Sequence, residues 1–340
     1  MLANGKMSGK VPTVPGGGRA GTAMRYLLAD IGGTNARFAL LEKGAAGAIE
    51  TLKVAAYPQA GDAIVAFLER HQATGTIAGA AIGVAGPVED GRCAFTNSDW
   101  VVDAAELKAA FGFGTVQVIN DFAAIGLSLP HLTGDDLFGV GADKRRREAP
   151  EVVLGPGTGL GVACLLRRQP PLVVASEGGH VTLASTEARQ AAVLGWLRNR
   201  FEHVSAERAL SGEGLASLHD SIAGIDGRRV PSRSPAEVTQ AALGGGCPVS
   251  REALDMFCAL LGSFAGDMAL TFGAAGGVYI AGGIVPRFAE HLARSEFRSR
   301  FEAKGRFRDW LAAIPVHVIR RSDPAFVGLA ALAVNADPAP

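Results

Sequence analysis

The sequence predicts an α/β fold, in which strands and helices alternate along the chain. Apolar segments of strand length are followed by segments whose apolar residues recur every three or four positions, a pattern typical of this class. Glycine makes up 45 of the 340 residues, about double its usual share of roughly 7%. Two strand–glycine turn–strand units, at 27–41 and 151–166, indicate a weak internal duplication.

In the first part of the chain, each expected element follows from its apolar pattern. Leu27 to Leu41 (LLADIGGTNARFALL) predicts a buried strand, a glycine turn and a second strand. Ala63 to Arg70 has helical spacing, and Ile77 to Val88 predicts a buried strand that ends in a Gly-Pro turn. Val116 to Leu129 predicts a strand that leads directly into a helix.

The later elements follow from the same reasoning. Glu151 to Leu166 predicts another strand, glycine turn and strand. Arg251 to Phe272 predicts a helix with one buried face, and two glycines on this helix would let a neighbouring element approach closely. Gly276 to Arg287 predicts a strand capped by a glycine pair. Asp323-Pro324 predicts an N-cap followed by proline at the first position of a last helix.

Composition limits the classes of function that fit. Lysine plus arginine and aspartate plus glutamate balance at 33 each, so charge gives no indication of a nucleic-acid or membrane partner. The basic run at 144–147 is interpreted as a solvated loop. No apolar run is expected to span a membrane, and residues 1–24 are expected to form a disordered tail. The four cysteines lack zinc-site spacing, so we expect buried, reduced thiols in a cytoplasmic protein.

The glycine turns carry the first indication of chemistry. Asp30 ends a strand and is followed by Gly32, Gly33 and Thr34, where backbone amides and a hydroxyl could meet an anion. The turn at 155–161 matches neither a Walker loop nor a dinucleotide-binding motif. Each turn alone is more simply a β-hairpin. Two such turns, with a further glycine pair after a buried strand, predict a clamp for a polyphosphate whose metal faces Asp30 through water.

Polar residues elsewhere predict a sugar site and a base. Asp121 stands where a strand passes into a helix; it is either a helix N-cap or the carboxylate that takes a proton from a sugar hydroxyl. Carboxylates bind vicinal diols well, and Glu177 and His180 flank two glycines. Glu207 stands beside an expected helix start, where acids are usually dipole partners, and Asn97 is a turn residue or a hydroxyl ligand.

The chain resembles the bacterial glucokinases of the proteobacterial type, members of the hexokinase–actin–Hsp70 superfamily. The resemblance extends from about Tyr26 to Val334 with every motif in order: DIGGTNARFAL, TNSDW, INDFAAIGLSLP, GPGTGLGVA, SEGGHV, HVSAERALSGEGL and GGVYIAGGIVPR. It implies a two-domain actin-like ATPase (ribonuclease H-like) fold with a deep interdomain cleft. It also implies transfer of the γ-phosphate of ATP, with Mg²⁺, to the 6-hydroxyl of glucose, which feeds glycolysis. The implied partners are glucose, ATP and a second copy in a homodimer.

The resemblance also assigns residues and domains. Asp121 corresponds to the catalytic base and Asp30 to the residue that faces Mg²⁺. The implied sugar ligands are Asn97, Asn120, Asp121, Glu177, His180 and Glu207. The implied nucleotide-binding residues are Ala29, Asp30, Ile31, Gly32, Gly33, Thr34, Gly157, Thr158, Gly159, Gly282 and Gly283. The implied domains are a small one at 25–131 plus 322–340 and a large one at 132–321, after the tail at 1–24.

Two alternatives stay open at this point. A kinase of the same fold could act on another hexose, such as fructose or an N-acetylhexosamine, because one pocket residue can redirect the choice. A sugar-sensing actin-like protein without turnover is less favoured, because the chain keeps Asp121 beside a complete sugar-ligand set. The cysteine-rich zinc motif of the related ROK proteins is absent from the sequence.

Overall fold

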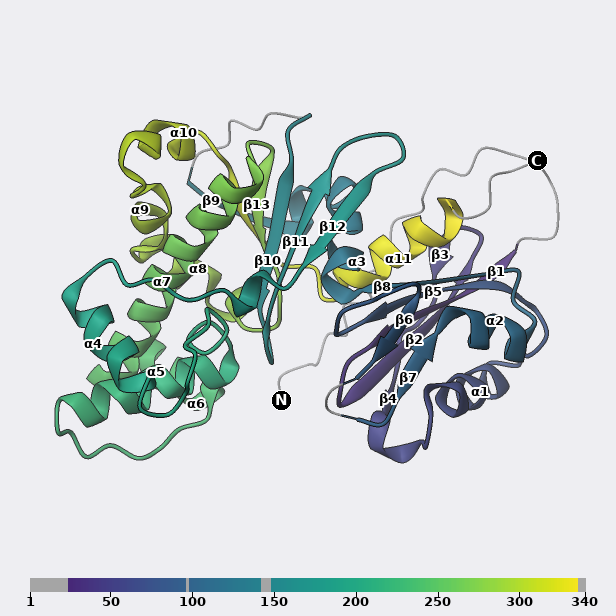
Figure 1. The fold of residues 1–340 in the computed structure, drawn as a ribbon, viewed down its shortest axis with the longest axis horizontal. Coiled ribbons are helices and arrows are strands. Elements are labelled where there is room, and N and C mark those ends of the chain that lie inside the picture. Colours follow the sequence, from purple (N-terminus) through teal and green to yellow (C-terminus); the bar gives the residue numbers. More distant parts are fainter. Residues whose placement is uncertain (1–23, 96–97, 142–147, 336–340) are drawn as a thin grey trace, which may run out of the picture. The chain divides into compact units, whose positions relative to one another are not determined.

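The computed structural model describes residues 24–95, 98–141 and 148–335, which divide into two compact units (Figure 1). Unit 1 takes the residues up to Leu132 and those from Ser322 onward, whereas unit 2 runs from Thr133 to Arg321. The predicted tail, apart from Met24, and the basic run at 144–147 lie outside the described residues.

Unit 1 is built on a sheet in the order β3–β2–β1–β5–β8, with β4 paired to β2. β1, β5 and β8 run parallel, and β2 runs antiparallel to β1, as the strand–turn–strand pattern predicts. A separate hairpin joins β6 and β7. The strands are β1 (Arg25–Ile31), β2 (Asn35–Glu42), β3 (Ala45–Ala46), β4 (Glu50–Lys53), β5 (Ile77–Val84), β6 (Arg92–Ala94), β7 (Val101–Asp103) and β8 (Thr115–Asn120).

Helices cover both faces of this sheet (Figure 1). Because side chains alternate along a strand, the odd-numbered residues of β1 enter the core beneath α1 and α2, and the even-numbered ones enter the core beneath α3 and α11. The helices are α1 (Ala60–Arg70), α2 (Ala104–Phe111), α3 (Asp121–Ser128) and α11 (Pro324–Asn335), with short 3-10 turns η1 (Val54–Ala56) and η2 (Leu129–His131). The last helix therefore returns to the unit that contains the first strand.

The packing of α11 on α3 depends on a glycine. A Cβ on Gly328 would lie 1.8 Å from the backbone oxygen of Ala124, so the two helices touch backbone to backbone. Pro324 is the first residue of α11, as predicted. Between the sheet and these helices, a Cβ on Gly83 would meet that of Ala124 at 3.6 Å, which is an ordinary contact.

Unit 2 contains a second sheet, in the order β12–β11–β10–β13–β14–β9. β10 is antiparallel to β11 and parallel to β13, which is parallel to β14. This repeats the arrangement β2–β1–β5–β8 of unit 1 and confirms the predicted internal duplication. The strands are β9 (Leu137–Val140), β10 (Glu151–Pro156), β11 (Leu160–Leu166), β12 (Leu172–Ser176), β13 (Gly277–Ile280) and β14 (Val316–Ile319).

The helices of unit 2 surround α7, the longest of them among the described residues. They are α4 (Ala188–Leu197), α5 (Gly212–Ile225), α6 (Pro235–Leu243), α7 (Pro248–Phe272), α8 (Ala289–Arg294), α9 (Phe297–Glu302) and α10 (Arg308–Ala312), with 3-10 turns η3 (Gly134–Asp136), η4 (Gly178–His180), η5 (Val285–Phe288) and η6 (Gly305–Phe307). α9 packs closely on α7, because Cβ atoms on Gly262 and Gly266 would lie 2.1 Å and 2.5 Å from the backbone oxygens of Phe297 and Phe301. The predicted close approach at the two glycines is confirmed.

The length and composition of α7 also fit a membrane span. It has 25 residues and a mean hydropathy of 1.4 over its most apolar window, which is long and apolar enough to cross a membrane. However, 83% of that window is buried, and its side chains belong to the core of unit 2. Composition alone does not separate a core helix from a membrane span; burial identifies α7 as a core helix.

A carboxylate fastens the two ends of unit 2 to each other. Asp136 accepts hydrogen bonds from the N–H and hydroxyl of Thr133, the first residue of the unit, at 2.9 and 3.1 Å. It also accepts one from Arg321, the last residue, at 3.2 Å. Burial raises the pKa of Asp136, but its bonds to Thr133 and the charge of Arg321 outweigh burial and hold the pKa below its usual range.

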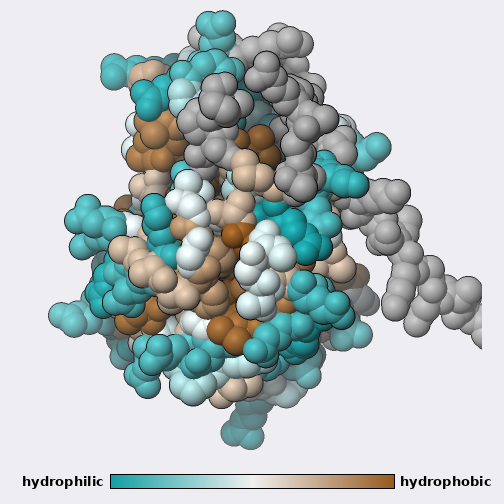
Figure 2. Space-filling model, turned by 90° about the vertical axis from the view of Figure 1, so that its right-hand side faces the viewer, coloured by the Kyte–Doolittle hydropathy of each residue, from teal (hydrophilic) through white to brown (hydrophobic). Residues whose placement is uncertain are grey.

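The surface of unit 1 is largely polar. The face turned to the viewer in Figure 2 mixes hydrophilic side chains with smaller apolar areas. Among the described residues of this unit, Met24 and Val65 are the large apolar side chains that are exposed, at 54% and 43%. The apolar residues of the predicted strands are instead buried between the sheet and its helices.

Candidate functional site

In unit 1, three predicted residues lie at one edge of the sheet. β1, β5 and β8 are parallel, so their C-terminal ends meet there. Asp30 on β1 pairs with Gly83 on β5, and Val84 on β5 pairs with Asn120 on β8. Asp121 follows directly. The carboxyl ends of parallel strands are where open α/β sheets bind their ligands, so this edge is the candidate site of unit 1.

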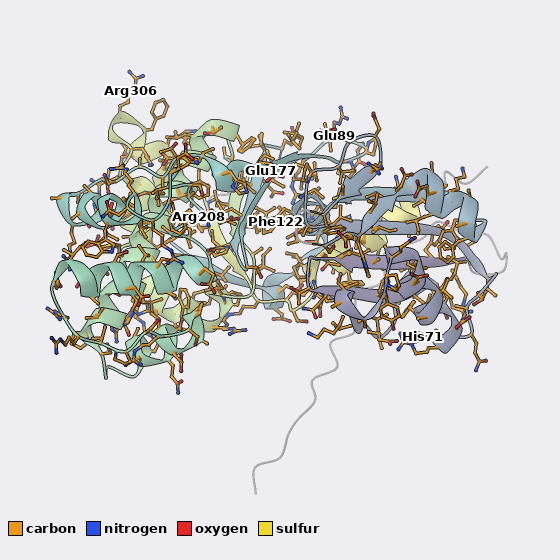
Figure 3. All side chains as sticks on the ribbon, turned by 60° about the horizontal axis from the view of Figure 1, so that its bottom comes forward. His71, Glu89, Phe122, Glu177, Arg208 and Arg306 are labelled. Carbon is orange, nitrogen blue, oxygen red and sulfur yellow. The ribbon has the colours of Figure 1, made fainter. Side chains whose placement is uncertain are left out.

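Asp121 is the first residue of α3, and the helix cap is its neighbour Asn120. The side-chain oxygen of Asn120 accepts from the N–H of Phe122 at 2.9 Å and of Ala123 at 3.2 Å. The interpretation of Asp121 as the N-cap was therefore wrong, although the N–H of Phe122 also reaches its Oδ1 at 2.8 Å. Burial, and then the negative charge of Asp121, raises the pKa of the Cys93 thiol. Figure 3 labels Phe122 at this turn.

Two asparagines, Asn120 and Asn97, are predicted sugar ligands, and the structure describes the first of them. The side-chain nitrogen of Asn120 donates to the backbone oxygen of Gly86 at 3.2 Å, so its amide holds the loop after β5 as well as capping α3. Its role toward a sugar stays a prediction. Asn97 lies outside the described residues.

Sequence reasoning missed the partner of Asp30. Arg37 on β2 pairs in register with Asp30, and its guanidinium forms an ion pair with the Asp30 carboxylate. The same guanidinium donates to Oδ1 of Asp323, just before α11, at 2.7 Å. Asp323 therefore links the last helix to the first hairpin rather than serving only as the expected cap. The available signal was the hairpin register, since a three-residue turn places position 37 opposite position 30.

The first glycine turn has room for a ligand. The N–H of Gly32 closes the turn by donating to the backbone oxygen of Asn35 at 2.9 Å. A Cβ on Gly32 would meet that oxygen at 3.7 Å, an ordinary contact. The fold itself therefore does not require glycine at this position. Close approach of a ligand to the backbone is a reason for glycine that the packing does not supply.

In unit 2, the second glycine turn and the later glycine pair lie together. β10 and β13 are parallel, and a Cβ on Gly282, which follows β13, would lie 2.2 Å from the backbone oxygen of Pro156 at the end of β10. Gly282 also has a φ of +87°, so both its backbone and its packing require glycine. By contrast, Gly157 and Gly283 have no atom nearer than 4.0 Å to a Cβ position. The open space is at the predicted nucleotide-binding positions.

The predicted sugar-binding segments of unit 2 join this turn. The N–H groups of Ala206 and Glu207 donate to the backbone oxygens of Val181 and Gly179 at 2.8 and 2.9 Å. A Cβ on Gly179 would lie 1.9 Å from the backbone oxygen of Leu160, so this segment packs directly on the end of the turn. The structure thus brings together three segments that are far apart in the sequence.

Glu207 connects the second glycine turn to the predicted sugar-binding segments. Its Oε2 accepts from the N–H of Leu160 at 2.8 Å, and a Cβ on Gly159 would lie 2.4 Å from the same oxygen. The interpretation of Glu207 as a first-turn acid was wrong, because α5 begins only at Gly212. The N–H of Gly212 in turn donates to the backbone oxygen of Gly157 at 2.9 Å. The carboxylate and the start of α5 therefore both fix the turn.

Glu177 and His180 are exposed on the same side of their segment. Their side chains are 58% and 60% exposed, and Glu177 Oε2 lies 3.9 Å from His180 Nε2 (Figure 3 labels Glu177). Glu177 precedes the short turn η4 and His180 is its last residue, and the central Gly179 is buried against β11. The buried glycine anchors the turn and leaves the two polar side chains in solvent, where hydroxyl groups could meet them.

Comparisons with known proteins identify the family. The family model for glucokinase matches residues 27–336. The chain belongs to the glucokinase family. It is 46% identical to a glucokinase of Paramagnetospirillum magneticum, covering 91% of this chain and 97% of that one. A crystal structure of glucokinase from an Antarctic psychrotroph is similar at a TM-score of 0.81 and 35% identity, covering 92% and 99% of the two chains.

More distant structures share the fold of this glucokinase family member. A ROK family glucokinase from Streptomyces griseus, in complex with glucose and AMPPNP, gives a TM-score of 0.62 at 21% identity, over 91% of this chain and 98% of that one. The predicted family and the actin-like fold class are confirmed. The chain is an ATP-dependent sugar kinase of the glucokinase family, and the sensor alternative is not favoured.

Proposed function

We propose that this enzyme transfers the γ-phosphate of ATP directly to the 6-hydroxyl of D-glucose, with Asp121 accepting the proton of that hydroxyl. The observation that carries the proposal is the placement of Asp30 and Asp121 at the same sheet edge. Asp30 pairs with Gly83, which pairs with Ile119 on β8. Two strand spacings separate these positions by roughly 10 Å. That separation supports one carboxylate at the phosphate end and another at the acceptor end of a phosphoryl transfer.

Asp30 is the residue we propose to face Mg²⁺. Mg²⁺ on a nucleotide keeps several waters and takes only one or two protein carboxylates, so a single aspartate at the strand end fits this role. When bound, the ion would neutralise charge on the transferring phosphate. Arg37 holds the Asp30 carboxylate from the neighbouring strand. Through this pairing the chain fixes the orientation of the carboxylate before a nucleotide binds.

The amides of the two glycine turns are proposed to hold the phosphates. The supporting observation is that packing does not require glycine at Gly32, Gly157 or Gly283. Gly157 already uses its N–H toward the oxygen of Gly159, at 2.8 Å. It would therefore contribute its lack of a side chain, while the amides of Thr158 and Gly159 would donate. Gly33 and Thr34 would serve in the same way in the first turn.

The sugar ligands are proposed to be Asn97, Asn120, Glu177, His180 and Glu207, together with Asp121. Each carboxylate has two oxygens, and Glu207 uses Oε2 toward the backbone of Leu160. Oε1 would then accept a sugar hydroxyl proton. We also propose that the enzyme acts as a homodimer in the cytoplasm, an expectation that rests on the family. Light scattering coupled to size-exclusion chromatography tests the dimer.

A coupled ATP-turnover assay over a panel of hexoses tests the function. Glucose should stimulate turnover most, and phosphorus NMR should identify the product as the 6-phosphate ester. A preference for fructose or an N-acetylhexosamine would change the proposed substrate but would still be consistent with a sugar kinase. Absence of sugar-stimulated turnover with every hexose would refute the proposal. Omitting Mg²⁺ should abolish turnover if the nucleotide is used as its magnesium complex.

A further inference from the structure

Unit 2 contains a cavity that the proposed phosphoryl transfer does not use. Its volume is about 530 Å³, and it lies where the end of α6, the first turns of α7 and the segment η5–α8 meet. Pockets that bind small molecules usually measure roughly 300–1,000 Å³, so the cavity has the size of a ligand site. Leu243 ends α6, Arg251 and Asp255 belong to α7, and Arg287 and Arg294 belong to η5 and α8. All of its lining residues come from this one unit.

The cavity and the second glycine turn lie at opposite ends of α6. A Cβ on Gly212 would lie 3.5 Å from the side chain of Pro235, the first residue of α6, and 3.5 Å from the backbone oxygen of Gly157 in the turn. α6 has nine residues, so its last residue, Leu243, lies about 12 Å from its first at roughly 1.5 Å per residue. A ligand of the cavity would therefore lie beyond the turn that we propose to hold the phosphates of ATP.

The acidic side chains that line the cavity already have partners. Asp255 Oδ1 lies 2.8 Å from Nε2 of His291, and Glu290 forms an ion pair with Arg320. The other ring nitrogen of His291 lies 3.4 Å from a guanidinium nitrogen of Arg251, which can only donate. This contact assigns Nδ1 of His291 as the acceptor and Nε2 as the donor toward Asp255. One carboxylate is thus bonded to a histidine and the other to an arginine from outside the lining.

Two arginines of the cavity have no such partner. Arg287 and Arg294 are exposed, and their side chains form no ion pair or hydrogen bond among the described residues. With Arg251, three guanidinium groups line the cavity, and each presents several N–H donors in a plane that suits two-point binding of a phosphate. Leu243, which is 43% exposed, and Phe288 add apolar surface. The cavity therefore combines donors for an anion with a surface for an organic group.

We propose that this cavity is a second binding site, whose ligand is a small organic phosphate. The guanidinium groups of Arg287 and Arg294 bind the phosphate, Arg251 adds positive charge, and the organic part of the ligand lies against Leu243. Like charges that line one cavity repel each other, so a doubly charged phosphate removes a cost that the empty cavity carries. None of these residues belongs to the proposed glucose or ATP ligands, so the inference does not depend on the proposed function.

Isothermal titration calorimetry of the full-length enzyme with phenyl phosphate tests the site. Phenyl phosphate carries the dianion and an apolar group, and it should bind with a Kd below about 1 mM. Inorganic phosphate lacks the apolar group and should bind at least about threefold more weakly. Saturation of the nucleotide site with AMPPNP should leave the affinity for phenyl phosphate unchanged, because the cavity and the glycine turn lie at opposite ends of α6.

Substitutions at exposed positions locate the binding site without disturbing the core. Arg287→Gln and Arg294→Gln should each weaken the binding of both phosphates by roughly fivefold to tenfold, because each removes charged donors. Leu243→Ala should weaken the binding of phenyl phosphate only. Arg306→Gln is the matched control, since Arg306 is an exposed arginine of the same unit that projects from η6 (Figure 3) and does not line the cavity. It should leave both affinities unchanged.

Four results would overturn the proposal. The first is no detectable binding of phenyl phosphate at millimolar concentration. The second is loss of that binding in the presence of AMPPNP, which would place the phosphate at the nucleotide turn. The third is unchanged affinity in both arginine variants, which would place it elsewhere on the surface. The fourth is equal affinity for inorganic and phenyl phosphate, which would exclude an organic ligand. Absence of sugar-stimulated turnover would refute the proposed function and leave the other measurements as they are.

Discussion

Replacing Asp121 by asparagine tests the proposed base with little change of structure. The two side chains have nearly the same shape, but the amide does not accept a proton at neutral pH. Asn120 caps α3 through its own side chain, and that cap remains in the variant. The glycine turns lie on other elements and are untouched. The substitution therefore removes the proton-accepting carboxylate from the C-terminal edge of the unit 1 sheet and leaves the other groups there in place.

The position of Asp121 at the start of α3 allows the size of two effects to be predicted, one on stability and one on turnover. At the first position of α3, the lost attraction between a carboxylate and the helix N-terminus should cost about 0.3–1 kcal/mol of stability. Loss of a general base lowers turnover by roughly 10²–10⁴, which corresponds to about 3–5 kcal/mol in the activation barrier. The effect on catalysis should thus exceed the effect on folding several-fold.

Coupled ATP turnover, glucose binding by calorimetry and denaturant unfolding measure the three consequences separately. Asp121→Asn should lower kcat by the stated factor, keep glucose affinity within about threefold and unfold at nearly the same midpoint. Asp103→Asn is the matched control, because Asp103 caps α2 in the same unit by accepting from two helix amides and asparagine caps equally well. It should leave all three measurements unchanged. Turnover of Asp121→Asn within tenfold of wild type would remove Asp121 from the role of base.

Three further predictions concern unit 2, the α3–α11 packing and pH. Gly159→Ala should displace Glu207, which lies 2.4 Å from the new methyl, and raise the KM for glucose as Glu207→Gln does; additive effects in the double variant would contradict this. Gly328→Ala should destabilise unit 1 by about 1–3 kcal/mol, whereas Gly195→Ala, in open space within α4, should stabilise by about 0.5–1 kcal/mol in denaturant unfolding. Because the folded pKa of Asp136 is lowered, Asp136→Asn should cost stability above about pH 4 and progressively less as pH falls below it; a pH-independent loss would exclude the ionic contribution.

The sequence predicts most of the elements but not the contacts that complete the site. Both strand–turn–strand units could be located because apolar runs bounded by glycines are local signals. The contact of Glu207 with Leu160 joins residues 47 positions apart, and no local pattern contains that information. Arg37 was accessible in principle, since the hairpin register places it opposite Asp30. Its bond to Asp323 was not, because it depends on where α11 returns.

The same limit applies to α7. Its composition fits both a membrane span and the central helix of a domain, because both environments are apolar on all sides. Only the helices and strands packed around it decide between them. Helix interpretation from sequence is therefore weakest where a helix is most completely buried.

The glycines of unit 2 fall into two kinds, and the distinction explains how the turn is held. Gly179 and Gly282 are required by packing, because a methyl would meet a backbone oxygen at 1.9 or 2.2 Å. Gly157 and Gly283 have open space, which packing does not explain. Glycines of the first kind clamp the turn against its neighbours, so glycines of the second kind can present bare backbone to a ligand at a fixed place. Glu207 both holds the turn and takes part in the proposed sugar site, since the oxygen that accepts from the N–H of Leu160 belongs to a carboxylate proposed to bind the sugar. A movement of this carboxylate would therefore change the proposed phosphate-binding turn and the proposed sugar site together.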